Sequence, residues 1–152
     1  MEKIKIIIAE DHPLMRSAIC NNSANESDQF EVIGQCCDGI ELLEILKYQQ
    51  PDIILLDIEM PRMDGMEVLK AIREKYNDTI KVLVFSANLS NYINLRLMQM
   101  GADGILFKKS SAEELIEAIN IVYKDSVFFQ DSLAFKMLSN NHNMKKESLE
   151  QF

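Results

Sequence analysis

The sequence of 152 residues is poor in the side chains that build disulfide frameworks, zinc sites and histidine-based active sites. Its three cysteines are Cys20, Cys36 and Cys37, an odd number with two of them adjacent, which fits neither paired bridges nor a zinc site. His12 and His142 are the only histidines, so a nucleophile activated by an imidazole base is disfavoured. These shortages favour a reducing compartment and leave carboxylates as the main candidates for chemistry.

Positive charge is also scarce. The chain has 16 basic and 24 acidic residues, for a net charge of -8. Because like charges repel, this balance argues against direct binding of the chain to nucleic acid or to an anionic membrane. The sequence shows no secretory leader pattern, no apolar run as long as a membrane span and no internal repeat. We therefore expect a cytoplasmic protein that contacts neither membrane nor nucleic acid.

What the sequence does contain is a regular alternation of short apolar runs with amphipathic segments. With 47% hydrophobic residues, the chain is long enough for one core and too short for two ordinary domains. Five runs have the length and composition of buried strands: residues 4–9, 30–36, 53–56, 80–85 and 104–107. Strands alternating with helices predict a doubly wound α/β fold of the flavodoxin-like (βα)5 type, with a parallel five-stranded sheet in the order 2-1-3-4-5.

The intervening helices have recognisable starts and stops. Pro13 suits the first turn of a helix after the first strand. Three later helices begin with a capping residue and a Glu three positions on: Asp38 with Glu41, Asp64 with Glu67 and Ser111 with Glu114. The spacing of Ile40, Leu43 and Leu46 places them on one face of a helix that ends before Pro51. Gly101 is placed to end the fourth helix.

Asp57 stands where a buried strand runs into a loop, within the stretch PDIILLDIEMPRMDG at residues 51–65. In open α/β sheets, ligands and chemistry collect at the carboxyl ends of the strands, so Asp57 is expected in the crevice and not in the core. Glu10 and Asp11 repeat this arrangement after the first strand. Taken singly, Asp57 could merely end a strand, and the other two acids could merely cap a helix.

The predicted strand order brings these acids together. Strands one and three are neighbours in the order 2-1-3-4-5, so Glu10, Asp11 and Asp57 would converge. The repulsion among three carboxylates is relieved by a raised pKa or by a hard cation, and Mg²⁺ fits best. The ends of strands four and five add the hydroxyl of Ser86 and the positive charge of Lys108. This set suits phosphoryl transfer to a carboxylate.

Four stretches carry a family resemblance: IIIAEDHPLMR, DIILLDIEMPRMDGME, VLVFSA and GADGILFKKSSAEELIEAI. In their order and spacing they resemble the receiver domain of bacterial two-component response regulators, over about residues 3–124. The residues from Glu10 to Arg16 and those of the GADG…EEL stretch are similar to the sequences of the branch that carries a LuxR-type helix-turn-helix output domain.

The resemblance implies a role for each acid. Asp57 would accept a phosphoryl group from a sensor histidine kinase, with Mg²⁺ as cofactor. Asp11 would bind the metal directly and Glu10 through water, while Asp57 and the backbone carbonyl of Glu59 would complete the metal shell. The chain would then be a phosphoacceptor with self-catalysed phosphorylation and dephosphorylation, and not an enzyme in the ordinary sense.

The resemblance also implies a switch. Ser86 would be the switch hydroxyl, Ala87 and the loop after it would reorder, and Lys108 would pair with the phosphate. Two positions depart from the family pattern. Ile105 occupies the place where the family usually has an aromatic residue, and Lys109 stands where many members have proline. Ile105 is therefore an atypical switch position.

The resemblance divides the chain in two. Residues 1–124 would form the receiver domain, and residues 125–152 a linker and tail with a short helix near residues 131–138. The output domain would be absent from this chain. Expected partners are a sensor histidine kinase, an output domain of the same protein or a partner protein, and a second copy upon phosphorylation.

Other protein classes fit the sequence less well. A flavodoxin-like flavin binder needs Ser, Thr or Gly after strand one to hold phosphate, whereas this chain has Glu-Asp-His-Pro at residues 10–13. A haloacid-dehalogenase-type phosphatase has its nucleophile after strand one and an Asp two places later, whereas Asp57 ends strand three and precedes Glu59. A freestanding or degenerate receiver that acts as a protein-binding module is the alternative function.

Overall fold

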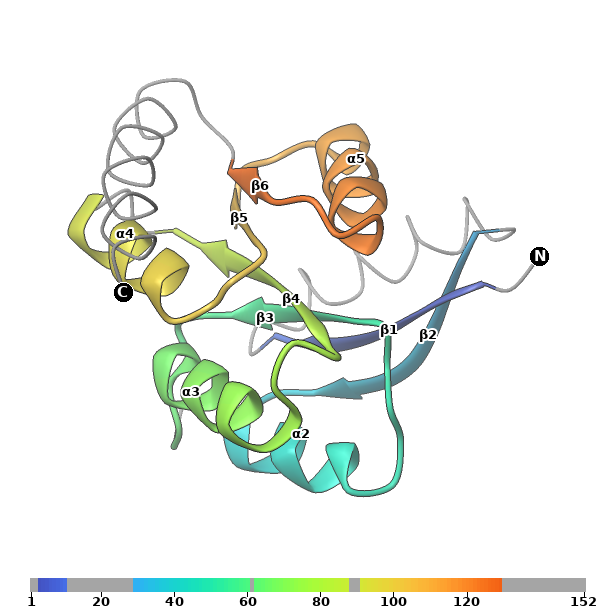
Figure 1. Ribbon diagram of the computed structural model, residues 1–152, viewed down its shortest axis with the longest axis vertical. Helices are drawn as coiled ribbons and strands as arrows, with labels where there is room; N and C mark the ends of the chain where they lie inside the picture. The colour runs from blue at the N-terminus through green and yellow to red at the C-terminus, as the bar shows by residue number, and fades with distance from the viewer. Residues whose placement is uncertain (1–2, 11–28, 61, 88–90, 130–152) are drawn as a thin grey trace, which may run out of the picture.

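A computed structural model describes residues 3–10, 29–60, 62–87 and 91–129. Its sheet has six strands in the order β2-β1-β3-β4-β5-β6, and every neighbouring pair is parallel (Figure 1). The strands are β1 (Ile4–Ala9), β2 (Phe30–Cys36), β3 (Ile53–Asp57), β4 (Lys81–Ser86), β5 (Gly104–Phe107) and β6 (Phe128–Phe129). The predicted doubly wound α/β fold and the order of its first five strands are confirmed.

The described helices cover both faces of the sheet. They are α2 (Gly39–Leu46), α3 (Gly65–Tyr76), α4 (Asn91–Gln99) and α5 (Ala112–Tyr123). Buried side chains of α2, α3 and α4 pack into one core cluster, whereas those of α5 pack into a second cluster on the other face. Figure 1 shows α5 on the opposite side of the sheet from α2 and α3. None of these helices combines the length and hydrophobicity that a membrane span requires. The helix predicted from Pro13 lies outside the described residues.

The capping patterns confirm the predicted helix starts. The side chains of Asp38 and Asp64 each accept a hydrogen bond from the backbone N–H three residues on, and Ser111 forms a complete capping box with Glu114. Gly101 follows α4 with a φ of 100°, a left-handed conformation that favours glycine.

The predicted inward face of α2 is wrong at one position. Leu42 and Leu46 are buried, four residues apart on one side of the helix, whereas Ile40 is 44% exposed and Leu43 is half-buried. The helix has only eight residues, so its sequence offers too little periodicity to show that Leu42, and not Ile40, lies on the buried face.

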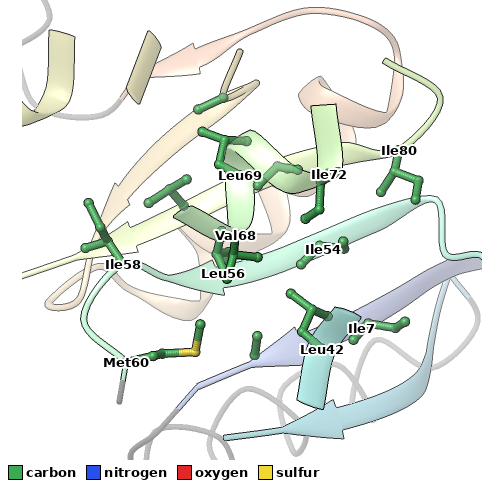
Figure 2. Close-up of a cluster of buried hydrophobic side chains, with 14 of the residues drawn as sticks. Ile7, Leu42, Ile54, Leu56, Ile58, Met60, Val68, Leu69, Ile72 and Ile80 are labelled. Carbon is green, nitrogen blue, oxygen red and sulfur yellow. The ribbon is translucent and has the colours of Figure 1, made fainter. Parts of the chain in front are cut away.

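Strand β3 is buried along its whole length because it lies in the middle of the sheet. Side chains alternate along a strand, so Ile54 and Leu56 pack with α2 and α3 while Ile53 and Leu55 pack with α5. Figure 2 shows the first of these clusters, with Ile54 and Leu56 beneath Val68 and Leu69. Burial on both faces explains the unbroken apolar run that precedes Asp57.

The sheet has one strand more than the sequence indicated. Phe128 and Phe129 form β6, which pairs with Gly104 and Ile105 of β5. The N–H of Phe128 also donates to the carbonyl of Asp103 at 3.0 Å. The sheet therefore continues past residue 124, where the sequence placed the end of the receiver. The helix predicted near residues 131–138 lies outside the described residues.

Candidate phosphoacceptor site at the carboxyl ends of the strands

Asp57 is the last residue of β3, and its side chain is only 1% exposed. A buried carboxylate is costly unless it is hydrogen-bonded and paired. Both of its oxygens have partners: Oδ1 accepts from the backbone N–H of Glu59 at 2.9 Å, and Oδ2 accepts from Nζ of Lys108 at 3.0 Å. The structure thus holds a carboxylate between a fixed N–H and a cation at the edge of the sheet.

Glu10 lies beside this carboxylate at the end of the neighbouring strand. The residues just before the two acids, Ala9 and Leu56, are paired across β1 and β3, so both acids leave the sheet at the same level. The N–H of Glu10 donates to the carbonyl of Cys36 at 3.0 Å, and the residue is buried. Asp11, the third predicted acid, lies outside the described residues.

Lys108 is the cation of this cluster, with a side chain that is 21% exposed. Its Nζ lies 3.0 Å from Asp57 Oδ2 and 3.8 Å from Glu59 Oε2. Burial alone would lower the pKa of Lys108, but the hydrogen bond to Asp57 and the attraction of Asp57, Glu10 and Glu59 outweigh it and raise that pKa above 10.5. The ammonium therefore stays charged at neutral pH. Lys109 is exposed. Both lysines lie in the turn after β5, so the alternation of side chains along a strand, from which the sequence separates them, does not apply here.

The loop after Asp57 is held from two sides. Gly65 donates its N–H to the carbonyl of Ile58 at 3.0 Å, and a Cβ on Gly65 would lie 2.5 Å from the Cα of Ile58, so this turn requires glycine. Arg62 has a φ of 65° and forms an ion pair with the buried carboxylate of Asp38, with Nε 3.1 Å from Oδ2. These contacts fix the segment that contains Glu59.

The pairing of Arg62 with Asp38 was not predicted, because the two residues are 24 positions apart and share no periodic pattern. Hydrogen bonds from the N–H of Glu41 and from Arg62 lower the pKa of Asp38 below 3.8. The carboxylate is therefore ionised at neutral pH, where it caps α2 and holds the loop through Arg62.

Ser86 ends β4 and is fully buried, with its carbonyl accepting from the N–H of Lys108 at 3.1 Å. Ala87 follows it and is exposed. Ile105 is buried in β5, between Val84 of β4 and Phe129 of β6. The ends of β4 and β5 are thus joined directly beside Asp57, and the atypical position Ile105 lies three residues before Lys108.

The donor chemistry of this edge fits a hard cation. Glu10 and Asp57 supply carboxylate oxygens, the ligands that Mg²⁺ prefers, and the backbone of Glu59 follows within the braced loop. Among the described residues, Cys37, Asp38 and Glu41 also bring ligand atoms within 4.8 Å of one another. That group is a poorer candidate, because the oxygens of Asp38 already serve Glu41 and Arg62.

Comparison with known proteins places the chain in a family. The model of the response regulator receiver domain matches residues 6–120. The transcriptional regulatory protein DegU of Brevibacillus brevis is 33% identical over 145 residues, which cover 95% of this chain and 58% of that protein. A probable transcriptional regulatory protein NarL of Mycobacterium tuberculosis is matched over 54% of its length. The chain therefore spans a little over half of the length of these curated relatives.

Solved structures lead to the same family. The signal receiver domain of the response regulator NarL from Mycobacterium tuberculosis is 35% identical with a TM-score of 0.76, over 82% of this chain and 98% of that one. A DNA-binding response regulator of the LuxR family from Staphylococcus aureus is 32% identical with a TM-score of 0.74, over 79% of this chain and 98% of that one. The chain therefore belongs to the response regulator receiver family and is similar to LuxR-family members, as its motifs indicated.

Proposed function

We propose that this chain is the phosphoacceptor of a two-component system and that Asp57 takes a phosphoryl group from a sensor histidine kinase. The observation that carries the proposal is the buried carboxylate of Asp57, held between the ammonium of Lys108 and the N–H of Glu59 with Glu10 alongside. Charged groups clustered in this way at a sheet edge are typical of functional sites and unusual as mere packing.

The residues divide the chemistry between them. An oxygen of Asp57 forms the new P–O bond while the P–N bond to the kinase histidine breaks, and the imidazole nitrogen takes a proton from water. Lys108 neutralises charge on the phosphoryl oxygens, which is the main requirement of this transition state. Asp11, Asp57, the carbonyl of Glu59 and, through water, Glu10 would hold Mg²⁺, which supplies further positive charge when bound. Small phosphoryl donors would serve in place of the kinase.

The consequence of phosphorylation begins at Lys108 and Ser86. A phosphoryl group on Asp57 puts new acceptor oxygens near both residues, so we expect Ser86 to turn toward it and the loop from Ala87 to reorder. The relatives are named as transcriptional regulators, and the chain spans only part of them. We infer a cytoplasmic regulator in which this domain controls an output domain or a partner protein, with a homodimer as the active form.

The test is incubation with acetyl phosphate and Mg²⁺, followed by intact-mass measurement. We expect the mass to increase by one phosphoryl group in the wild-type chain and in Asp64→Asn, a matched control whose exposed acid lies in the same loop. Asp57→Asn should take up none, and a chelator should prevent uptake by the wild type. An equal mass increase in Asp57→Asn would refute the assignment.

A further inference from the structure

The short strand β6 pairs with the edge of β5 and places one aromatic ring on each face of the sheet. Phe128 packs against the cluster beneath α5, whereas Phe129 packs against the cluster that contains Ile105. The backbone pairs Phe128 with Gly104 and Phe129 with Ile105. Because side chains alternate along a strand, two residues are enough to pack against both faces of the sheet.

The edge of β5 is shaped to accept this segment. A Cβ on Gly104 would lie 2.8 Å from the carbonyl oxygen of Phe128 and 2.6 Å from Cδ1 of Leu83, so a larger residue at that position would push β6 away. Next to it, Ile105 is paired with Phe129 of β6, and the side chains of both residues belong to the same core cluster. A glycine and an isoleucine thus form a docking edge on β5.

The docking edge is mechanically close to Asp57. Lys108, whose ammonium rests on Asp57, stands one residue past the end of β5 and three residues from Ile105. Its N–H donates to the carbonyl of Ser86 and so joins the end of β4 to the turn after β5, a strand of only four residues. A change in the contact between Lys108 and Asp57 would therefore act on the end of β5. A two-residue strand at a sheet edge is the element that such a shift would release first.

We propose that Gly104 and Ile105 form a docking site for the segment after α5, with Phe129 as its anchor, and that phosphorylation of Asp57 releases this segment. The second half of this inference rests on the proposed function of Asp57. The state of the acceptor would thereby reach the chain that continues beyond residue 129.

Tryptophan fluorescence can test the inference, because the chain contains no tryptophan. Phe129→Trp introduces a single probe at the anchor. We expect a blue-shifted emission that acrylamide quenches weakly in the unmodified chain. After acetyl phosphate and Mg²⁺ the emission should shift to the red, with the quenching constant rising about twofold. Tyr123→Trp, on α5 and 41% exposed, is the matched control and should not respond.

Intact mass of the same samples separates the two proposals. A phosphorylated Phe129→Trp chain whose emission and quenching stay unchanged would overturn the release. A chain that takes up no phosphoryl group would refute the proposed function instead. The docking site is then tested without phosphorylation by adding Ile105→Ala, or the milder Ile105→Val, to Phe129→Trp. Either change should increase acrylamide quenching, and unchanged quenching in both would overturn the docking site.

Discussion

At the amino ends of β4 and β5 the guanidinium of Arg73 is saturated with partners, whereas at the carboxyl ends the ammonium of Lys108 is shared among carboxylates. Arg73 donates five hydrogen bonds: to Asp103 at 2.6 Å, to the carbonyl of Ile80 at 2.6 Å, to that of Asn77 at 2.8 Å and twice to that of Gly101 at 2.8 and 3.0 Å. Asp103 accepts a further bond from the N–H of Val82 at 2.8 Å. Within the part of the chain that the structure describes, one cation therefore pairs with one carboxylate.

The opposite end is unbalanced. Lys108 lies within 4 Å of Asp57 and Glu59, and Glu10 also acts on it electrostatically. Among the described residues, the negative charge around Lys108 exceeds the positive charge, which favours an incoming cation and lets Lys108 change partners. The comparison teaches that a balanced, saturated ion pair fastens the fold, whereas a cluster with too few cations is prepared for a ligand.

The largest expected effect separates the two lysines next to the acceptor. Lys108→Ala should lower the rate of phosphorylation by acetyl phosphate by about 100-fold, because the phosphoryl oxygens lose their cation. Lys109→Ala should stay within about twofold of wild type, since an exposed lysine contributes little. Stopped intact-mass time courses measure both rates, and equal defects would show that Lys108 has no special role.

Loss of the saturated pair should act on stability instead. Arg73→Ala should lower the free energy of unfolding by about 3 kcal/mol, because it leaves the half-buried Asp103 without its cation. Urea denaturation followed by circular dichroism measures this, with Lys70→Ala on the exposed side of α3 as control. Phosphorylation per folded molecule should remain at the wild-type rate. A loss of less than about 1 kcal/mol would place this pair among ordinary surface ion pairs.

Neutralising one carboxylate in each cluster should shift stability in opposite directions. Asp57→Asn removes charge from the acidic excess and should raise the free energy of unfolding by about 1 kcal/mol. Asp103→Asn removes the carboxylate that pairs with Arg73 and should lower the free energy of unfolding by about 2 kcal/mol. The same urea titrations measure both changes in the free energy of unfolding. A destabilised Asp57→Asn chain would contradict the proposed difference between the acidic cluster and the Arg73–Asp103 pair.

The smallest effect appears at alkaline pH. The pKa of Lys108 is raised above 10.5 in the folded chain, so its stabilising contribution is complete below that value and is lost as pH rises through the folded pKa. The difference in unfolding free energy between wild type and Lys108→Met should therefore be constant up to about pH 10 and shrink above it. Arg73→Met should show no such decrease, because guanidinium does not titrate there.

The sequence predicted the acceptor side of the molecule well for a physical reason. Asp57, Ser86 and Lys108 each follow or end an apolar run, and parallel topology obliges the ends of such runs to meet at one edge. Their positions were therefore foreseeable, and the structure places the ammonium of Lys108 on Asp57. Their roles in phosphorylation stay predictions, as does the metal ligation by Asp11, which lies outside the described residues.

Contacts made by single polar side chains could not be predicted in the same way. Arg73 meets Gly101 and Asp103, 28 and 30 positions away, through side chains whose partners leave no periodic signal. The burial of Asn94 on α4 was likewise not predicted, because a polar side chain is not expected on the inward face of a helix. The strand β6 escaped prediction because two residues carry no alternation that could be recognised.

The pairing of Phe128 and Phe129 with β5 also affects where the C-terminal boundary of this domain should be placed when it is produced alone. A chain ending at residue 124, the boundary that sequence motifs indicate, would lack β6 and leave the edge of β5 at Gly104 and Ile105 uncovered. Unpaired strand edges are templates for pairing with another molecule. Self-association measured on such a shortened chain would therefore report the missing strand as well as the state of Asp57.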